Sequence, residues 1–405
     1  MSKIRVKHFG PIKEGCPNNK WIDIKKTTIF IGNQGSGKST VAKLISTLTW
    51  IEKALTRGDF NENDLIKYNR LKKYFAYQNL NDYFKDNTVI EYIGKAYSIS
   101  YDKGTVWVEN LNSKNYAFPK IMYVPSERNF TSSVRNVRTL KGLPSTLYTF
   151  SDEFVDALED LQGQISLPIN NVKLEYQKLN KISWIVGDNY KIRLSDSSSG
   201  FQSLVPLFVV SEYLAKSLGK EDKGNIKNIS IDEERRIRKE IERILSNPNI
   251  SSDIKLSSLE FLSSKFVYSS FVNIVEEPEQ NLFPSSQNSI LNTLFECNNL
   301  KEENYLVMTT HSPYIINYVS IAIQAGLILD KIKSEELKEK LNSVVPIKSI
   351  LKGKDVVIYQ LDEKNGSINI LPVFEGIPSD HNFLNDSLST GNKMFDTLLE
   401  IEQEL

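Results

Sequence analysis

The segment from Gly32 to Ser39 constrains the fold of this chain more than any other. It reads Gly-Asn-Gln-Gly-Ser-Gly-Lys-Ser and fits the pattern G-x-x-x-x-G-K-[ST]. The apolar run 27–31 before it predicts a buried strand, and residues 40–45 after it predict the start of a helix. Such a loop aims backbone N–H groups at an anion, and the helix N-terminus adds partial positive charge. The segment therefore predicts a phosphate-binding loop within an α/β fold.

This loop supplies the first set of nucleotide-binding candidates. Lys38 is expected to reach the β- and γ-phosphates of a nucleoside triphosphate, and the Ser39 hydroxyl is expected to bind Mg²⁺. The candidates are Gly32, Asn33, Gln34, Gly35, Ser36, Gly37, Lys38, Ser39 and Thr40.

Two later strands are each followed by polar side chains. Residues 270–275 predict a strand that ends at Glu276 and Glu277, and residues 305–310 predict a strand that is followed by His311. Ligands of open α/β sheets bind at the carboxyl ends of strands. Glu276 is therefore the candidate Mg²⁺ ligand, Glu277 the candidate base for an attacking water, and His311 a γ-phosphate sensor. The alternative for the two glutamates is an acidic loop after a strand. The catalytic candidates are Glu277, Glu276, His311 and Lys38.

A fourth motif, Ser-Ser-Gly-Phe-Gln at residues 198–202, precedes an apolar helical segment, 204–214. Serines before a glycine can simply cap a helix. In company with the other motifs, Ser199, Gly200 and Gln202 are candidates for holding a γ-phosphate presented by a second molecule, through the same anion-binding property of a helix N-terminus.

These motifs, in this order, resemble the ABC-type ATPases, in particular the SMC/RecF-like branch and the ATPase half of the OLD family. Residues 4–12 resemble the branch's first strand and turn, residues 123–128 its strand-Pro-x-Glu-Arg element, and residues 276–284 its fused Walker B and D-loop. The resemblance implies a mixed central sheet, an N-terminal antiparallel β subdomain and a helical lobe that carries the signature motif. It also implies ATP and Mg²⁺ as cofactors, with ATP held between two copies of the chain.

The sequence departs from the family pattern at several positions. Glu276 stands where most members carry Asp, and Phe201 replaces the second glycine of the signature. No clean Q-loop glutamine is found, and Glu127 is the candidate for that position. Asn281 and Phe283 occupy places where the family often has histidine.

The motifs divide the chain into three predicted parts. Residues 1–130 form the phosphate-loop half with a β subdomain, 131–270 a helical lobe with the signature, and 271–405 the second half of the core. Antiparallel strands are predicted at 89–93, 97–101 and 105–109, a hairpin at 356–361 and 367–371, and helices after His311, from Ser334 and over 382–405. A charged helix after Ser230 either packs on its own lobe or docks a partner.

Composition limits the partners and the compartment. The chain has 50 basic and 50 acidic residues, so no global positive field indicates nucleic acid, and DNA contact would need a local patch. Two cysteines suit a reducing cytoplasm. No secretory leader is expected, and the apolar stretches are too short for a membrane span. The sequence therefore predicts a cytoplasmic protein that does not bind a membrane, and a transporter subunit would need a separate membrane partner.

The resemblance also indicates a biological role. OLD-family proteins carry a C-terminal Toprim nuclease that needs an Asp-x-Asp cluster, and the residues after His311 contain none. The chain thus resembles stand-alone ATPases of bacterial anti-phage systems (Septu-like, PARIS-like or retron-associated), in which a separate polypeptide is the effector. We expect an ATP-hydrolysing homodimer or higher oligomer that controls such an effector. The alternatives are a RecF-like DNA-repair ATPase that binds DNA directly, and a transporter ATPase.

Overall fold

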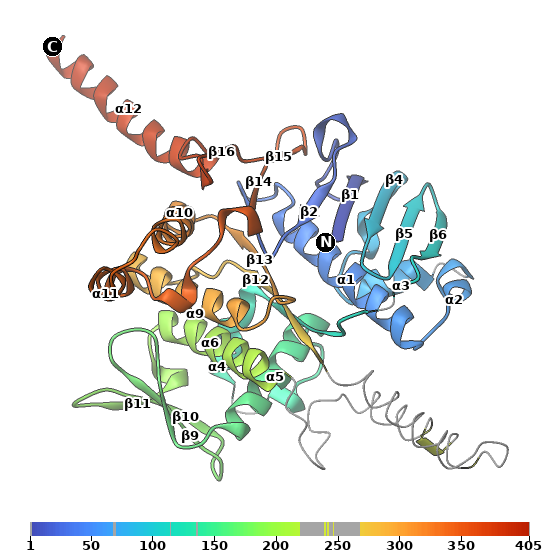
Figure 1. Ribbon diagram of the computed structural model, residues 1–405, viewed down its shortest axis with the longest axis horizontal. Helices are drawn as coiled ribbons and strands as arrows, with labels where there is room; N and C mark the ends of the chain where they lie inside the picture. Colours follow the sequence, from blue (N-terminus) through green and yellow to red (C-terminus); the bar gives the residue numbers. More distant parts are fainter. Residues whose placement is uncertain are drawn as a thin grey trace.

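The computed structural model describes residues 2–67, 70–113, 115–134, 137–218 and 268–404, with a few isolated positions between 219 and 267. In these ranges the chain forms a mixed central sheet, an antiparallel sheet beside it and a lobe that carries α4, α5 and α6 (Figure 1). The predicted α/β architecture is confirmed. The predicted charged helix after Ser230 lies outside the described residues.

The central sheet has the strand order β15-β14-β3-β13-β12-β7, and its neighbours are parallel except for the antiparallel pair β14 and β15. Its strands are β3 (Thr27–Gly32), β7 (Pro119–Val124), β12 (Ser270–Glu276), β13 (Tyr305–Thr310), β14 (Val356–Leu361) and β15 (Ile368–Ile370). Every residue of β3 and of β12 is buried, as expected for parallel strands covered on both faces. The predicted strands at 27–31, 270–275 and 305–310 are confirmed, and their carboxyl ends meet at one edge.

Each face of the central sheet has its own hydrophobic core. Ile29 and Ile31 point into a core shared with the helices of one side, whereas Phe30 points into a core shared with the other side. This alternation follows from the two-residue period of a strand. The first side carries α9 (Pro284–Asn299), α10 (Pro313–Leu329) and the lobe helices, and the second carries α1 (Lys38–Arg57) and the antiparallel sheet.

The antiparallel sheet has the order β2-β1-β4-β5-β6. Its strands are β1 (Ser2–Phe9), β2 (Ile22–Ile24), β4 (Phe84–Ile93), β5 (Tyr97–Asp102) and β6 (Thr105–Asn110). The three strands predicted between 89 and 109 are confirmed. Two short helices that we did not predict, α2 (Glu62–Ile66) and α3 (Arg70–Ala76), lie between α1 and β4.

The signature lobe contains α4 (Asn129–Ser133), α5 (Ser145–Asp160) and α6 (Ser199–Ser217). The sequence had suggested a helical lobe, but the lobe also contains strands. An antiparallel sheet of order β11-β10-β9-β8 lies between α5 and α6 in the chain (Figure 1). Its strands are β8 (Gln164–Ser166), β9 (Lys173–Gln177), β10 (Ile182–Val186) and β11 (Lys191–Arg193). They are only three to five residues long, too short for the alternation of side chains, as in Leu174 and Tyr176, to stand out in the sequence.

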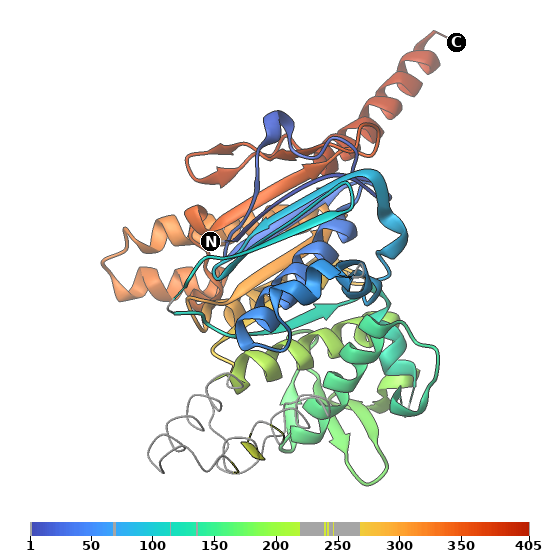
Figure 2. The same ribbon diagram turned by 90° about the vertical axis from the view of Figure 1, so that its right-hand side faces the viewer.

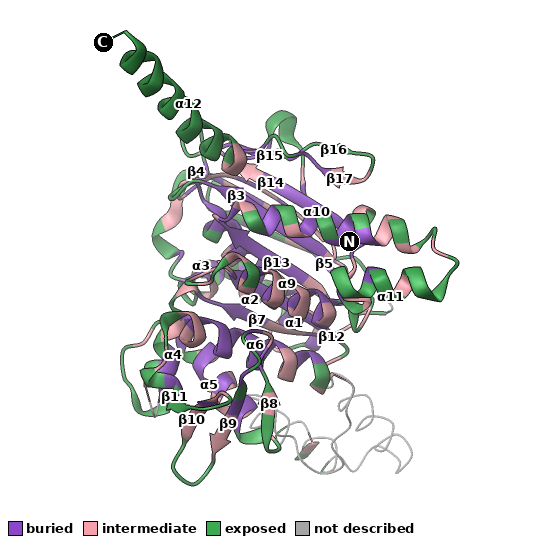
Figure 3. Cartoon of the chain, turned by 90° about the vertical axis from the view of Figure 1, so that its left-hand side faces the viewer, coloured by how far each residue is buried: buried purple, intermediate pink, exposed green. Residues whose placement is uncertain are grey.

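The C-terminal part contains α11 (Glu335–Val344), the confirmed hairpin of β14 and β15, the small pair β16 (Val373–Phe374) and β17 (Ile377–Pro378), and α12 (Phe383–Gln403). α12 extends away from the rest of the chain (Figure 2), and all of it is exposed apart from its first turn (Figure 3). Among the described residues, no helix combines the length and the apolar character that crossing a membrane requires.

Short 3-10 turns complete the described structure. They are η1 (Pro17–Asn19), η3 (Asn81–Tyr83), η4 (Ser126–Arg128), η5 (Val137–Thr139), η6 (Leu194–Asp196), η7 (Ile347–Ser349) and η8 (Gly353–Asp355). Of these, η4 matters most for the site, because it joins the end of β7 to the signature lobe.

Candidate active site

The phosphate-loop candidates lie between β3 and α1, as the sequence predicted. Gly37 precedes the first residue of α1 with φ of 102°, a left-handed conformation that favours glycine. Gly32 has no room for a side chain, because a Cβ atom there would lie 2.4 Å from the carbonyl oxygen of Leu361 at the end of β14. Ser39 is exposed at the start of α1, whereas Ser36 and Thr40 are buried. The loop therefore packs tightly against the sheet edge and leaves Ser39 accessible.

Lys38 is folded back onto its own loop. Its Nζ donates hydrogen bonds of 2.8 Å to the carbonyl oxygens of Gly32 and Asn33. Burial lowers the pKa of Lys38 to about 8, against the opposing effect of nearby carboxylates, of which Glu277 is the strongest. The buried Ser36 Oγ has no hydrogen-bond partner among the described residues. Both groups can bind an incoming phosphate. Ser36 has a free hydroxyl, and Lys38 can replace its two carbonyl acceptors with phosphate oxygens.

The two predicted carboxylates stand at the end of β12. Glu276 is buried, and its carboxylate accepts a hydrogen bond from the Tyr123 hydroxyl at the end of β7. Burial raises the pKa of Tyr123, which keeps the phenol protonated as a donor. In the sheet register, Glu276 lies opposite Thr309, which lies opposite Phe30. The Glu276 backbone is therefore two strand spacings, about 10 Å, from the strand that leads into the phosphate loop.

Glu277 adopts an unusual backbone conformation. Its φ of 44° lies in the left-handed region, which is uncommon for residues other than glycine and is often found at functional sites. Its N–H donates to the Thr309 carbonyl oxygen at 2.9 Å, which attaches it to β13. Its Oε1 lies 3.4 Å from His311 Nε2, and the hydrogen bond to His311 lowers the pKa of Glu277. The structure thus brings together Glu277 and His311, both of which the sequence predicted.

Glu279 is a residue of this site that sequence reasoning missed. Its Oε1 accepts hydrogen bonds from the His311 backbone N–H at 2.7 Å and from the Thr310 hydroxyl at 2.8 Å. The carboxyl group is buried, and burial raises its pKa. Its Oε2 has no partner among the described residues. Glu279 therefore fixes the backbone that carries His311. The sequence feature that could have identified Glu279 as a site residue is its place in the run Glu-Glu-Pro-Glu.

Arg128 is the second missed residue, and it ties the carboxylates to the signature lobe. Its side chain is fully buried, with an exposed fraction of 0%. The guanidinium donates to the carbonyl oxygens of Glu276 at 2.7 Å, Glu277 at 2.6 Å and Ser203 on α6 at 3.1 Å. Burial lowers its pKa to about 10 although carboxylates surround it. Its neighbour Glu127, the candidate for the Q-loop position, is exposed.

The signature residues lie at the start of α6, on the lobe. Gln202 uses its side-chain amide within the chain, donating to the carbonyl oxygens of Ser195 at 2.9 Å and Ser197 at 3.0 Å. It thereby holds the turn that precedes the helix. A Cβ atom on Gly200 would lie 3.0 Å from the Asn281 carbonyl oxygen, so the D-loop candidate packs on this helix start. Ser199 is exposed and available to a ligand from outside.

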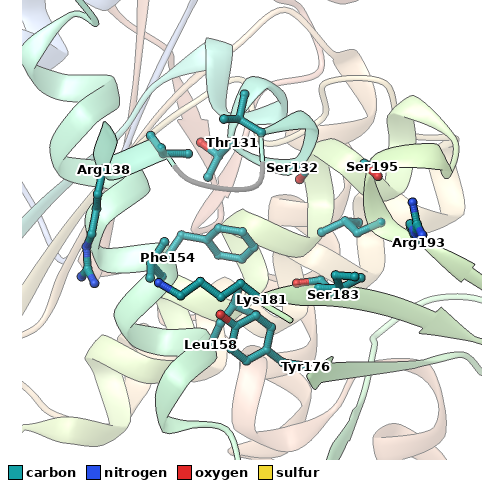
Figure 4. A pocket seen from close by; sticks show the side chains of 15 residues that line it. Thr131, Ser132, Arg138, Phe154, Leu158, Tyr176, Lys181, Ser183, Arg193 and Ser195 are labelled. Atoms are coloured by element: carbon teal, nitrogen blue, oxygen red, sulfur yellow. The ribbon is translucent and has the colours of Figure 1, made fainter. Parts of the chain in front are cut away.

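A small hollow lies next to the signature (Figure 4). Its cations are Arg138, Lys181 and Arg193, and the Lys181 side chain extends between Phe154 and Tyr176. Arg138 already pairs with Asp152 and Asp156 on α5. The hollow has a volume of about 70 Å³, which is room for a few water molecules and not for a nucleotide. The hollow is therefore not a second nucleotide site.

The candidate metal ligands suit Mg²⁺, which usually takes one or two carboxylates together with phosphate oxygens and water. Ser39 and Glu276 offer hard oxygen ligands of this kind. Among the described residues, no group of three or more His, Cys, Asp or Glu side chains could hold a metal on its own. A metal here would therefore depend on the phosphates for much of its coordination.

The likeness of this chain to known proteins is structural. No protein-family model matches the sequence, and no curated protein sequence matches it. The SMC head domain from Thermotoga maritima aligns over 92% of this chain and 98% of its own, with 11% identity and a TM-score of 0.38. An Smc head domain bound to the C-terminal domain of ScpA, from Pyrococcus furiosus, aligns over 98% of this chain and 100% of its own, with 9% identity and a TM-score of 0.35.

An ATP-binding cassette in a dimeric post-hydrolysis state, bound to ADP and Pi, aligns over 92% of this chain and 100% of its own, with 11% identity and a TM-score of 0.29. These values describe a distant likeness of fold. The function is argued below from the side chains of this chain.

Proposed function

We propose that this chain binds ATP with Mg²⁺ and hydrolyses it. The observation that carries the proposal is the meeting of Lys38 with Glu276, Glu277 and Glu279, whose charges all act on the pKa of Lys38. Lys38 would bind the β- and γ-phosphates, and Ser39 and Glu276 would hold Mg²⁺, which supplies Lewis-acid stabilisation of the phosphate charge. The nucleotide binds at Gly32–Thr40.

Glu277 is proposed as the base. It would accept a proton from water as the water oxygen attacks the γ-phosphorus and the bond to the β-phosphate oxygen breaks. The lowered pKa of Glu277 keeps it ionised and able to accept that proton near neutral pH. His311, held by Glu279 and 3.4 Å from Glu277, would contact the γ-phosphate or orient the water.

The proposal is tested by Lys38→Ala with isothermal titration calorimetry of ATP and Mg²⁺. Loss of two charge-assisted hydrogen bonds at about 1.5 kcal/mol each predicts an affinity about 100-fold lower. Lys43→Ala, on the same helix and outside the loop, is the matched control and should bind ATP as the wild type does. Equal ATP affinity in Lys38→Ala and wild type would contradict the phosphate-loop assignment.

We further propose that the working unit is a homodimer or a higher homo-oligomer. Ser199, Gly200 and Gln202 lie on the lobe, with Ser199 exposed at the N-terminus of α6. A helix N-terminus is suited to an anion, and here the anion would be the γ-phosphate bound to another subunit. Arg128 bonds α6 to the backbone carbonyl groups of Glu276 and Glu277, so a contact at the signature reaches the backbone that carries the two catalytic carboxylates.

Control of a separate effector, as in anti-phage defence, is the role that we propose for this ATPase. The supporting feature is α12, in which none of the 21 residues is buried. Its apolar side chains, 41% to 65% exposed, are Leu388, Met394, Phe395, Leu398, Leu399 and Ile401. A helix of this kind gains most of its stability from packing its apolar face, which indicates a partner.

The charge of α12 favours a partner different from this chain. The acidic residues of the segment are Asp386, Asp396, Glu400, Glu402 and Glu404, against the single basic residue Lys393. Two copies of α12 would bring like charges together, whereas an effector with an apolar groove and a basic rim would complement them. We therefore propose that α12 binds the effector.

This assignment is tested by co-purification with the product of a neighbouring gene. Phe395→Glu with Leu398→Glu should abolish co-purification, and Ser389→Glu, on the opposite face of the helix, should retain it. Retained co-purification in the double variant would contradict the assignment. So would a change in the oligomeric state of the ATPase alone, measured by light scattering, because that would make α12 a self-association element.

A further inference from the structure

A cavity apart from the phosphate loop lies between α1, α3, β7 and α5, beside the edge of the central sheet that β7 forms (Figure 3). Its volume is about 480 Å³. Sites for small organic ligands typically measure about 300–1,000 Å³. The cavity is therefore large enough for a bicyclic or tricyclic molecule.

Aromatic side chains dominate its lining. Trp50 and Tyr74 have ring centroids 5.2 Å apart, and Tyr77, Tyr148 and Tyr268 add further rings. Three of these rings remain partly open to solvent, with exposed fractions of 38% for Trp50, 43% for Tyr77 and 41% for Tyr148. Flat apolar faces at the mouth of a cavity favour a planar aromatic ligand, because ring stacking stabilises such a complex beyond the burial of area.

Of the six charged side chains of the lining, all but Lys73 are engaged with other groups among the described residues. Lys120 pairs with Glu153, and Lys53 lies 4.3 Å from the centroid of the Tyr268 ring. Asp152 and Asp156 both pair with Arg138, which lies outside the lining. A ligand with a net charge would have to compete with these pairs, so an uncharged ligand fits the cavity better.

One polar group of the lining has an unmet hydrogen bond. Gln78 is 2% exposed, and its Nε2 donates to Ser46 Oγ at 3.2 Å. Its Oε1 has no partner among the described residues. A buried acceptor without a donor is destabilising, and a ligand N–H that reaches it after a small rotation of the amide would relieve that cost.

The cavity also touches the candidate active site. Tyr123 lines it, and the Tyr123 hydroxyl donates to the Glu276 carboxylate. Ser46 and Thr47 line it from α1, the helix that begins at Lys38. A ligand that shifts Tyr123 therefore acts on the candidate Mg²⁺ carboxylate through a single hydrogen bond.

We propose that this cavity binds an uncharged planar heteroaromatic molecule with an N–H donor, and that its occupancy changes the rate of ATP hydrolysis. The second half rests on the proposed ATPase function. The first half stands independently, because none of the residues that form the cavity belongs to the phosphate loop.

The test uses two probes, indole and 1-methylindole, which share shape but differ in the N–H donor. Indole should bind saturably to the wild-type chain, and about fivefold more tightly than 1-methylindole because it can satisfy Gln78. Trp50→Ala should weaken indole binding about tenfold. Trp107→Ala removes an exposed tryptophan from β6, outside the cavity, and is the matched control that should bind indole normally.

Gln78→Leu should bind both probes with equal affinity. Absence of saturable indole binding to the wild-type chain, or unchanged binding in a folded Trp50→Ala variant, would overturn the proposed site. Thermal unfolding of each variant establishes that it is folded before binding is measured.

The coupling is measured as the ATPase rate with and without saturating indole. A change of about fivefold is expected in the wild type. In Tyr123→Phe, which keeps the ring and removes the hydroxyl, indole should bind and leave the rate of that variant unchanged. Indole binding without a rate change in the wild type overturns the coupling. Lys38→Ala should lose ATP and retain indole, so failure of the nucleotide assignment and failure of this site are distinguishable.

Discussion

Replacement of Arg128 by methionine tests how the signature lobe is joined to the carboxylates. The wild-type guanidinium donates to four carbonyl oxygens, those of Pro125, Ser203, Glu276 and Glu277. Methionine has a similar length and no donor, so Arg128→Met removes all four of these hydrogen bonds, although the Pro125 and Glu277 oxygens keep a backbone N–H donor each.

The magnitude follows from two opposing contributions. Four hydrogen bonds from a charged donor contribute about 1.5–3 kcal/mol each, or about 6–12 kcal/mol together. Burial of the charge opposes them, and the fall of the Arg128 pKa from 12.5 to about 10 corresponds to about 3 kcal/mol. The smallest net contribution of the Arg128 side chain to stability is therefore about 3 kcal/mol. Removal of one partner from a buried ion pair, the nearest measured comparison, costs about 3–5 kcal/mol.

The assay is the free energy of unfolding from urea titration, with the ATPase rate measured in parallel. We expect Arg128→Met to lose about 3–5 kcal/mol of stability and most of its hydrolysis. Arg138→Met is the control, because that side chain is 36% exposed and its ion pairs contribute at most about 1 kcal/mol. An Arg128→Met variant within about 1 kcal/mol of the wild type would refute the reasoning.

Two further predictions concern the nucleotide. Gly200→Asp should bind ATP and fail to hydrolyse it, because its carboxylate would repel the γ-phosphate bound to the other subunit. In mixtures with Lys38→Ala, in which subunits exchange, some ATP turnover should return. Normal hydrolysis by Gly200→Asp alone would contradict the composite site. ATP affinity should fall about tenfold from pH 7 to pH 9, because bound phosphate needs the Lys38 ammonium. The pKa of Lys38 is about 8 in the free chain and must rise on ATP binding, so the contribution of the ammonium to affinity is present below pH 8 and lost above it. Lys38→Arg keeps its charge over this range and should show no such fall, and a flat wild-type profile would rule out the role of the Lys38 proton.

Much of the fold followed from local patterns in the sequence. The strands β3, β12 and β13 were predictable because each is a short apolar run that ends in polar residues, and the phosphate loop was predictable because its glycines and lysine have fixed spacing. The antiparallel strands β4, β5 and β6 followed from the alternation of side chains and from the turn at Gly104.

The residues that escaped prediction act through contacts that are distant in the chain. Arg128 reaches Ser203 and Glu277, which lie 75 and 149 positions away. Glu279 contacts Thr310 and His311, across a loop, a helix and a strand. Both side chains lie in motif segments, but no local pattern shows which distant groups they contact. The sheet of β8 to β11 escaped for another reason, because its strands have only three to five residues and their alternation is too brief to mark them.

The most direct test of the central claim is a comparison of wild type with Glu277→Gln. The amide keeps the size of the side chain but cannot accept a proton, so phosphate release should slow by about 10²–10⁴-fold while ATP still binds. Glu303→Gln, an exposed glutamate before β13, should hydrolyse ATP at the wild-type rate. Wild-type hydrolysis by Glu277→Gln would contradict the assignment of Glu277 as the base and, with it, the account of this site.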